Sequence, residues 1–397
     1  PLRKGASRIE VAPSPDGVQQ VRYFVDGYPY THRSMGKAEA SAAIGYMRQV
    51  AAMDVSDRRR PQKSSGASTG RPAKNVGEVT TAGSSAGEMM VIELDIAKRY
   101  ELRLGEMGFS EDQLQTLQAS IDRGSGIVLT AAPKGQGLTS LLYALVRAHD
   151  AFVYHIQTVE RDPPAELEGV TQNKLPTNAS AADEFKQVNW VVSNEPDVLM
   201  VGQVDDPRSA IELIKLAKAG KRVYVGVRAG STFEALAAWR KLVGDDRAAL
   251  SELDLIVSGR VVRQLCMACK VAYTPDPDAL RKMNLSPDRV GQLFQARTQP
   301  LRDQRGNEVP CEFCGDLRFK GRLGIYETLV VSDEVRSVIA AGGSSEQLKA
   351  VFRKQRQRYL QEMALARVEA GDTSIQEVLR VLRGESSSSR STERATA

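Results

Sequence analysis

Two pairs of cysteines constrain this chain more than any other feature of its sequence. Cys266 and Cys269 form one C-x-x-C motif, Cys311 and Cys314 form a second, and the sequence has no further cysteine. Two such motifs supply four thiolates, the ligand set that tetrahedral Zn²⁺ prefers. A site closed by four sulfurs has no open position, so the predicted role of the zinc is structural. The alternative is four unrelated reduced thiols, although unrelated cysteines rarely fall into two matched pairs.

The composition narrows the class of protein. The chain has 397 residues, and 54 Lys and Arg against 49 Asp and Glu give a net charge of +5. This length predicts roughly two to three domains. Four cysteines exclude a disulfide scaffold, and three histidines argue against a His-rich metal centre. The positive charge is mild and not clustered, so we expect no specific nucleic acid as a partner.

Neither a membrane span nor a signal peptide is predicted. No apolar run approaches the roughly 18 residues that cross a bilayer. The start of the chain has no signal-peptide pattern. The sequence starts at Pro1 and not at Met, so we expect that an N-terminal part is missing. The predicted compartment is the cytoplasm.

The pattern of apolar residues predicts two units of different architecture. Residues 1–100 alternate at strand spacing around a helical stretch, which predicts a small α+β unit. Residues 101–384 alternate strands and helices, which predicts an α/β domain with a mainly parallel sheet. This second unit includes the cysteine segment 266–314 and mostly helical residues after it. The Ser-rich residues 385–397 are predicted to be disordered. The expected strands of the second unit lie at 127–130, 152–156, 198–201 and 223–227.

A phosphate-binding loop is indicated after the first of these strands. The string APKGQGLT at 132–139 corresponds to the pattern G-x-x-x-x-G-K-[ST]. Gly135 and Gly137 would let backbone N–H groups surround phosphates, and the Thr139 hydroxyl could hold Mg²⁺. Leu138 occupies the lysine position and supplies no charge. Lys134 is an alternative cation, and the simplest alternative is a plain strand-to-helix turn.

A second candidate strand, 197–203, ends in Gln203 where an acid would polarise the attacking water. An amide cannot act as a base. Asp205 and Asp206 follow, but either could be a helix N-cap. Glu160 and Asp162 lie past another strand end, where the sites of open α/β sheets collect. The three histidines, His32, His149 and His155, have no partner at metal-ligand spacing and are expected to be ordinary surface or core residues.

Taken together, these motifs resemble the hexameric assembly ATPases of type II secretion and type IV pilus systems. The resemblance covers nearly the whole chain in order, with ASRIEVAP (6–13), VRYFVDG (21–27), DVLMVGQVDD (197–206), GRVVRQLC (259–266), GRLGIYE (321–327) and GDTS (371–374). It implies a PAS-like N-terminal domain (1–100) and a RecA-like P-loop domain (101–384) with a tetracysteine zinc insertion. Retraction ATPases typically lack that insertion, so a secretion- or extension-type relative is expected.

The departures from the family pattern fall mainly on the residues that handle phosphate and catalysis. Leu138 replaces the Walker A lysine, Gln203 replaces the Walker B glutamate, and Arg228 stands near the family's His box. Positions that resemble arginine fingers hold Asn189 and Ser193. Asp205, Phe24 and Glu78 stand at or near positions where the family has arginines. The family's Asp box, at 158–163, carries an extra residue. The residues that the resemblance leaves for nucleotide, Mg²⁺ or catalysis are Lys134, Gly135, Gly137, Thr139, Arg22, Arg58, Arg59, Glu160 and Asp206.

Three hypotheses follow. The first is a pseudo-ATPase that keeps the fold and the zinc and acts as a structural or regulatory ring subunit, with ATP and Mg²⁺ binding weakened. The second is an ATPase motor with a rearranged site, in which Lys134 and Glu160 or Asp206 compensate. The third, a nucleic-acid-binding module, ranks last. The resemblance implies a homo- or hetero-hexamer, inner-membrane platform proteins as partners, and a cytoplasmic location peripheral to the inner membrane.

Overall fold

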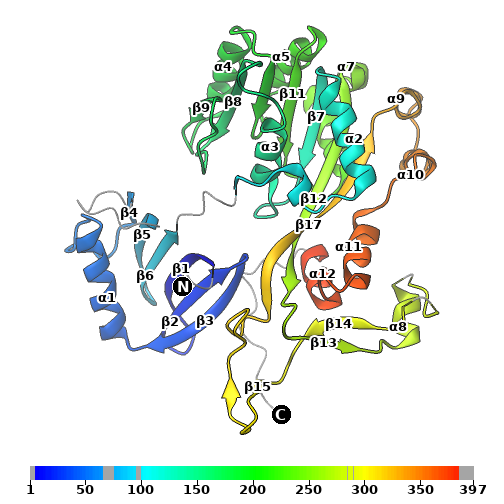
Figure 1. Cartoon of the computed structure of the whole chain (residues 1–397). Coiled ribbons are helices and arrows are strands. Elements are labelled where there is room, and N and C mark those ends of the chain that lie inside the picture. The colour runs from blue at the N-terminus through cyan, green and yellow to red at the C-terminus, as the bar shows by residue number, and fades with distance from the viewer. Residues whose placement is uncertain (1–4, 66–75, 95–99, 284, 289, 384–397) are drawn as a thin grey trace.

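The computed structural model describes residues 5–65, 76–94, 100–283, 285–288 and 290–383. Within these ranges the chain forms two large sheets (Figure 1). The predicted disordered tail, 385–397, lies outside the described residues. No helix in the described ranges is both long and apolar enough to span a bilayer.

The N-terminal unit is a six-stranded antiparallel sheet with one helix. Strand order is β3-β2-β1-β6-β5-β4. In the last strand, Met90, Ile92 and Leu94 alternate with less buried residues and share one core with Ala40 and Ile44 of the helix, in agreement with the period-2 pattern of the sequence. The elements are β1 (Ala6–Pro13), β2 (Gln19–Val25), β3 (Tyr28–Met35), α1 (Lys37–Val50), β4 (Gln62–Ser65), β5 (Val76–Ser84) and β6 (Gly87–Leu94).

A buried charge fixes the helix of this unit to its sheet. Arg48 on α1 is almost completely buried, and its guanidinium donates to Glu88 at 2.6 Å and to Thr81 at 3.1 Å. Ala40 and Ile44, four residues apart on the same helix face, enter the apolar core beside it. A buried guanidinium with carboxylate and hydroxyl partners avoids the cost of an unpaired charge.

The second unit is built on a seven-stranded sheet. Its order is β17-β12-β7-β11-β10-β8-β9, with every pair parallel except β12 and β17. The predicted mainly parallel α/β sheet is therefore confirmed. The strands are β7 (Gly126–Ala131), β8 (Ile156–Arg161), β9 (Thr171–Leu175), β10 (Val198–Val201), β11 (Arg222–Val227), β12 (Leu253–Leu265) and β17 (Phe319–Val330).

Helices cover both faces of this sheet, as parallel strands require. One apolar cluster joins α2 and α3 to one face, and another joins α4, α5 and α6 to the opposite face. The central strands are buried throughout, so their sequences are continuous apolar runs. The helices are α2 (Glu111–Asp122), α3 (Leu138–Val146), α4 (Ala181–Val192), α5 (Pro207–Lys218), α6 (Thr232–Val243) and α7 (Asp246–Ser251), with a short 3-10 helix, η4 (Leu104–Glu106).

The predicted strand at 152–156 is wrong. Strand β8 begins only at Ile156, and the side chains of Phe152 and Val153 are 100% and 70% exposed. Asp150 forms a turn instead, because its side chain accepts the N–H of Phe152 at 2.9 Å and its carbonyl accepts the N–H of Val153 at 3.0 Å. Apolar residues in this segment suggested a strand, but the local hydrogen bonds of Asp150 decide the backbone conformation.

Strands β12 and β17 continue beyond the sheet and carry the cysteine segment and the C-terminal helices (Figure 1). Among its described residues, the cysteine segment contains four short strands and one helix. The elements are β13 (Lys270–Tyr273), α8 (Pro277–Lys282), β14 (Leu293–Ala296), β15 (Leu301–Arg302), β16 (Glu308–Val309), α9 (Asp333–Ala340), α10 (Ser345–Lys354), α11 (Leu360–Glu369) and α12 (Ile375–Leu382).

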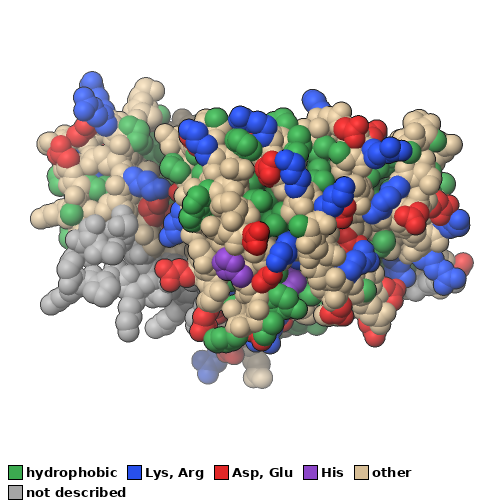
Figure 2. Space-filling model, turned by 90° about the horizontal axis from the view of Figure 1, so that it is seen from above, with side chains coloured by type: hydrophobic (Ala, Val, Ile, Leu, Met, Phe, Trp, Pro, Cys, Tyr) green, Lys and Arg blue, Asp and Glu red, His purple; other side chains and the backbone are tan. Residues whose placement is uncertain are grey.

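Acidic and basic side chains are interspersed on the face formed by the top of the second unit (Figure 2). No extended area of one sign stands out on this face, which agrees with the small net charge of +5. The picture gives no support to a nucleic-acid footprint there, because such a footprint gathers Lys and Arg on one surface.

Candidate functional site

The loop between β7 and α3 has the backbone of an anion-binding turn. Gly135 and Gly137 have φ of +76° and +86°, in the left-handed region that favours glycine. Gly137 is the N-cap of α3. Because glycine has no side chain, it offers no side-chain acceptor to the N–H groups of the first helical turn. The backbone could therefore donate to an oxyanion.

The lysine position of the loop is part of the apolar core. Leu138 is only 3% exposed and belongs to the cluster that includes Leu141 and Leu142 on α3. Thr139, the next residue, is half-buried and lines a cavity at the end of the sheet. The loop has a hydroxyl suited to a metal ion, but the side chain at position 138 offers no positive charge to a bound phosphate.

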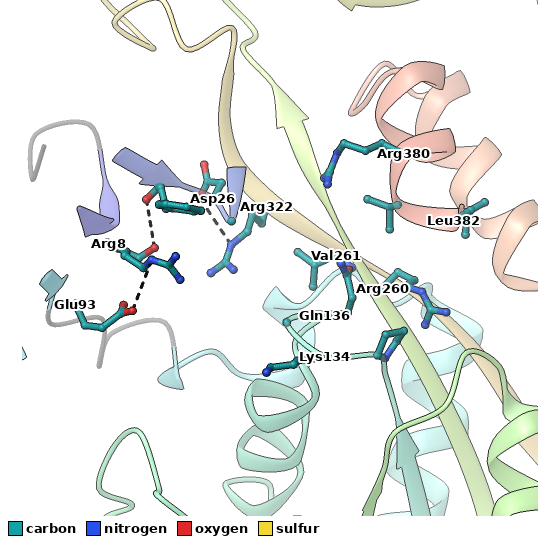
Figure 3. A pocket seen from close by; sticks show the side chains of 16 residues that line it. Arg8, Asp26, Glu93, Lys134, Gln136, Arg260, Val261, Arg322, Arg380 and Leu382 are labelled. Carbon is teal, nitrogen blue, oxygen red and sulfur yellow. Dashed lines mark hydrogen bonds and ion pairs between the residues drawn. The ribbon is translucent and has the colours of Figure 1, made fainter. Parts of the chain in front are cut away.

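Lys134 lies on the other side of the loop and lines a larger cavity of about 540 Å³ (Figure 3). This cavity lies between the N-terminal sheet, the loop, β12, β17 and α12. Its arginines come from four separate segments: Arg8, Arg260, Arg322 and Arg380. Sequence analysis did not find this group, because the residues are far apart in the chain and share no motif.

Most arginines of the larger cavity have acidic partners. Arg8 pairs with Glu10 at 2.7 Å and with Glu93 at 3.9 Å. Arg322 pairs with Asp26 at 3.7 Å, as Figure 3 shows. Among the described residues, no ion pair involves Lys134, whose side chain is exposed. Lys134 is thus available to a bound anion, although it lines a different cavity from Thr139.

The smaller cavity, about 270 Å³, brings five of the predicted site residues together. Thr139, Glu160, Asp162, Gln203 and Arg228 all line it, although they come from four separate parts of the sequence. Glu160 is buried and accepts a hydrogen bond from the Thr158 hydroxyl at 2.7 Å. Burial lowers the pKa of Arg228. This cavity lies at the carboxyl ends of the parallel strands, where ligands of open α/β sheets bind.

Gln203 and Asp206 have structural partners. The Gln203 side chain donates to Asp205 at 2.7 Å. Asp206 caps α5 by accepting the N–H of Arg208 at 2.8 Å, and it forms an ion pair with the same arginine. The hydrogen bond from the Arg208 side chain is the main cause of the lowered pKa of Asp206. The N-cap interpretation of Asp206 is therefore supported, and Asp206 is not among the described residues that line either cavity.

The arginines retained in the N-terminal unit lie away from the loop. Arg58 contacts the Ser41 hydroxyl at 3.4 Å and Glu88 at 3.9 Å. The carbonyl of Arg59 accepts the N–H of Gly83 at 3.3 Å. Arg22 forms an ion pair with Glu10. None of these three arginines is among the described residues that line the two cavities.

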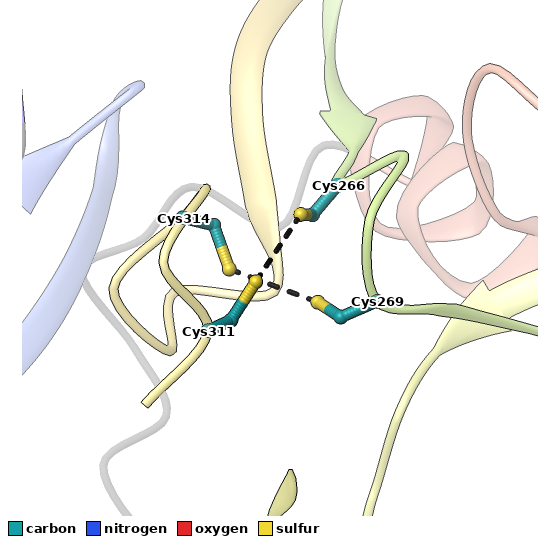
Figure 4. Close-up of side chains that lie close together, drawn as sticks. All are labelled: Cys266, Cys269, Cys311 and Cys314. Atoms are coloured by element: carbon teal, nitrogen blue, oxygen red, sulfur yellow. Dashed lines mark hydrogen bonds between the residues drawn. The ribbon is translucent and has the colours of Figure 1, made fainter. Parts of the chain in front are cut away.

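The four cysteines come together in a buried cluster (Figure 4). Their sulfurs all lie within 4.8 Å of one another, with 3.9 Å between Cys266 and Cys311 and 3.7 Å between Cys269 and Cys314. A disulfide needs about 2.05 Å between sulfurs, so these thiols are free. A tetrahedral site with Zn–S bonds of about 2.3 Å has edges of about 3.8 Å. The donor set and its spacing fit zinc.

Charged groups around the cluster orient the second motif. Arg297 is buried and forms an ion pair with Asp316, whose carboxylate also accepts the N–H of Cys311 at 3.0 Å. Hydrogen bonds from backbone N–H groups, first that of Cys314, lower the pKa of the Cys311 thiol, whereas burial raises the pKa of the Cys269 and Cys314 thiols. Arg297 lies between the two motifs and belongs to no motif that would have predicted its role.

Comparison with known proteins identifies the family. The family model described as "Type II/IV secretion system protein" matches residues 1–380. "Type IV pilus assembly ATPase PilB" of Thermus thermophilus is 27% identical over 94% of this chain, which spans 41% of that relative. "Type II secretion system protein E" of Klebsiella pneumoniae is 30% identical to this chain. The match covers 91% of this chain and 70% of that relative.

A solved structure shares the fold. The Legionella pneumophila ATPase DotB covers 96% of this chain and 93% of its own, with a TM-score of 0.60 and 14% identity. At that identity the likeness concerns the fold alone. The match to nearly the whole family model decides the membership: this chain belongs to the type II/IV secretion system protein family, as its motifs indicated.

Proposed function

We propose that this chain is a pseudo-ATPase, a structural or regulatory subunit of a hexameric ring in a type II secretion or type IV pilus machine. One observation carries the proposal: Leu138, at the lysine position of the phosphate loop, is buried in the apolar core. Gln203 adds to it, because an amide stands where the family has a base. The loop keeps its glycine-dependent backbone while the charge for phosphoryl transfer is missing.

The magnitudes favour loss of catalysis. General-base catalysis is typically worth about 10²–10⁴-fold and an arginine finger about 10³–10⁵-fold in rate. These effects need not multiply. Even the smaller of them, combined with a missing phosphate lysine, leaves little of a motor's rate. The apolar residues of the strands and the four cysteines show no comparable replacements.

ATP and Mg²⁺ remain possible ligands of weakened affinity. The Thr139 hydroxyl and the carboxylate of Glu160 would face the metal in the smaller cavity, and the backbone N–H groups at Gly135 and Gly137 would face phosphates. The larger cavity, on the Lys134 side, has room for a base and ribose. Arg58 and Arg59 were proposed as nucleotide ligands, but they are not among the described residues that line either cavity; contact would require movement of their loop.

The remaining assignments rest on membership of the family. We propose a PAS-like domain for residues 1–100 and a RecA-like domain for 101–384, with structural Zn²⁺ bound by Cys266, Cys269, Cys311 and Cys314. The ring would be a homo- or hetero-hexamer that contacts inner-membrane platform proteins from the cytoplasmic side. The antiparallel sheet with α1 and the mostly parallel sheet support the two domain assignments, and the sulfur spacing supports the zinc.

The alternative function is an active motor with a rearranged site. Lys134 favours it, because this exposed side chain belongs to the loop and has no ion-pair partner among the described residues. Glu160 also favours it, since a carboxylate shares the smaller cavity with Thr139. In this account Lys134 would neutralise phosphates and Glu160 would orient water or metal.

Titration of the zinc-loaded protein with Mg·ATP separates the two functions, if binding and phosphate release are both followed. The pseudo-ATPase predicts phosphate release at the background rate, with or without weak binding. Turnover that Lys134→Ala abolishes, and that the matched exposed variant Lys218→Ala leaves unchanged, would establish the motor and refute the pseudo-ATPase.

A further inference from the structure

The turn that follows the second cysteine motif has an unusual backbone. Gly315, Asp316 and Arg318 have φ of +57°, +68° and +65°. Two of them are not glycine, and such residues keep a left-handed conformation only where their surroundings impose it. We call residues 315–318 the knuckle turn.

Both cysteine motifs impose this conformation. The N–H of Gly315 donates to the carbonyl of Cys311 at 2.7 Å, and the N–H of Leu317 donates to that of Cys314 at 3.2 Å. From the first motif, the N–H of Cys266 donates to the carbonyl of Arg318 at 3.0 Å. The knuckle turn is thus attached at both ends to the residues that would bind the metal.

The knuckle turn is also where the N-terminal unit docks. Leu317 packs against the apolar core of that unit, although it is far from it in sequence. Its carbonyl accepts a hydrogen bond from the Tyr30 hydroxyl of β3 at 3.2 Å, and the same hydroxyl accepts from Arg263 of β12 at 3.1 Å. Figure 1 shows β2 and β3 beside the lower part of β17.

A second contact lies just beyond the turn. Asp26, between β2 and β3, accepts the N–H of Gly321 at 2.9 Å and pairs with Arg322 at 3.7 Å. The side chains of Arg322 and Asp26 are 32% and 16% exposed, and a half-buried ion pair of this kind is worth about 1 kcal/mol. By itself this pair would hold the N-terminal unit weakly, whereas Leu317 adds apolar burial from a fixed backbone.

We propose that zinc in the cysteine site sets the orientation of the N-terminal unit relative to the α/β unit, through the knuckle turn. With zinc bound, the turn is held in its left-handed conformation and presents Leu317 to the N-terminal core. Without zinc, only the hydrogen bonds of the turn and the Arg297–Asp316 ion pair restrain the two motifs, the turn relaxes, and the unit is released. The inference rests on the proposed zinc, but it assigns the metal a role outside its own segment.

A distance measurement between the two units tests this inference on the full chain. Spin labels attached to p-acetylphenylalanine at Tyr46 of α1 and at Phe152 avoid any new cysteine, and both positions are exposed, at 66% and 100%. Double electron–electron resonance then gives the distribution of distances between the two labels, and the zinc content of each sample is measured. We expect one narrow peak for zinc-loaded protein and a broad distribution after chelation under reducing conditions.

Two variants keep the test valid if chelation unfolds the segment. Leu317→Ala and Tyr30→Phe leave all four cysteines in place, so we expect bound zinc together with a broadened distribution, more for Leu317→Ala. Tyr23→Phe, in the neighbouring strand and without a hydrogen bond from its hydroxyl among those described, should keep the narrow peak.

Each contrary outcome has its own meaning. A metal-free, folded chain that keeps the narrow peak would overturn the docking role and leave the zinc assignment intact. A folded, reduced protein that never contains zinc would refute the site itself, and the inference with it. Zinc-loaded Leu317→Ala with an unchanged narrow peak would show that the knuckle turn does not orient the N-terminal unit.

Discussion

Strand β12 touches both candidate sites, and the two differ in the side chains they offer for their chemistry. At Val261 its backbone N–H donates to Gln136 of the phosphate loop at 3.0 Å, and just past its end stands Cys266. The cysteine site has four buried sulfurs at metal-binding distances. The phosphate loop has its glycines, but position 138 is a core leucine.

The difference follows from what each site does for the fold. A structural metal contributes folding free energy directly, so loss of one cysteine would cost the whole segment. The lysine and the base of a phosphate site contribute to transition-state stabilisation and not to packing. They can be replaced while the strands and the loop persist. The predictions below test whether the two sites differ in this way.

The largest effect is expected from Cys266→Ser. Removal of one thiolate from the four should abolish zinc binding, and structural zinc binding in small peptides is worth about 10–16 kcal/mol. Metal analysis and hydrogen exchange would show zinc lost and the strands around the site exchanging faster, with loop 131–139 unchanged. Met267→Ser, an exposed position in the same motif, is the control and should keep the zinc. Full retention of zinc by Cys266→Ser would contradict the assignment.

Glu377→Gln should have the next largest effect, because Glu377 joins α12 to β12 between the two sites. Its buried carboxylate accepts from Arg263 at 2.7 Å and from Arg380 at 2.6 Å. Burial alone would raise the pKa of Glu377, but the hydrogen bonds from Arg380 and Arg263 outweigh it and lower that pKa to about 2. Loss of this charge should reduce the free energy of unfolding at pH 7 by about 3 kcal/mol.

The pH dependence of the Glu377 effect has a definite sign. The folded pKa lies below the unfolded value of about 4.3, so the stabilisation is complete above that pH and is lost as the pH falls toward 2. Urea unfolding should therefore show a wide gap between wild type and Glu377→Gln at pH 7 and a narrow one near pH 2.5. A gap of equal width at both values would contradict this account, and exposed Glu369→Gln should show none.

A smaller loss is expected when the lysine is restored to the loop. Leu138→Lys places an ammonium group in the apolar core without a bound phosphate, which should cost about 2 kcal/mol of folding free energy. Leu138→Met keeps the volume and should cost less than about 1.5 kcal/mol. Urea unfolding without nucleotide measures both. A Leu138→Lys protein as stable as wild type would mean that the site still accommodates the charge and is less degenerate than proposed.

The smallest effect is expected from Lys134→Ala. Lys134 is exposed and makes no ion pair among the described residues, so the change in stability should stay within about 0.5 kcal/mol. Phosphate release should stay at the background rate. A larger destabilisation would show that the loop depends on this side chain.

Features that depend on local pattern were predictable from the sequence. The β7–loop–α3 unit followed from an apolar run, two glycines and a helical stretch, and the cysteine cluster followed from motif spacing. Features that depend on the tertiary fold were not. Arg8, Arg260, Arg322 and Arg380 converge on one cavity only because the N-terminal sheet, β12, β17 and α12 meet there. At 152–156 the apolar pattern gave the wrong answer, since the Asp150 turn exposes the side chains that suggested a strand.

One preparation can test the central claim, that the architecture is kept while the motor chemistry is replaced. Zinc content and phosphate release from Mg·ATP are measured on the same purified protein, beside Lys134→Ala and Cys266→Ser. The account predicts one equivalent of zinc per chain in wild type and Lys134→Ala, none in Cys266→Ser, and phosphate release at background in all three. Sustained release by wild type that disappears in Lys134→Ala, or a folded, reduced wild type without zinc, would contradict it.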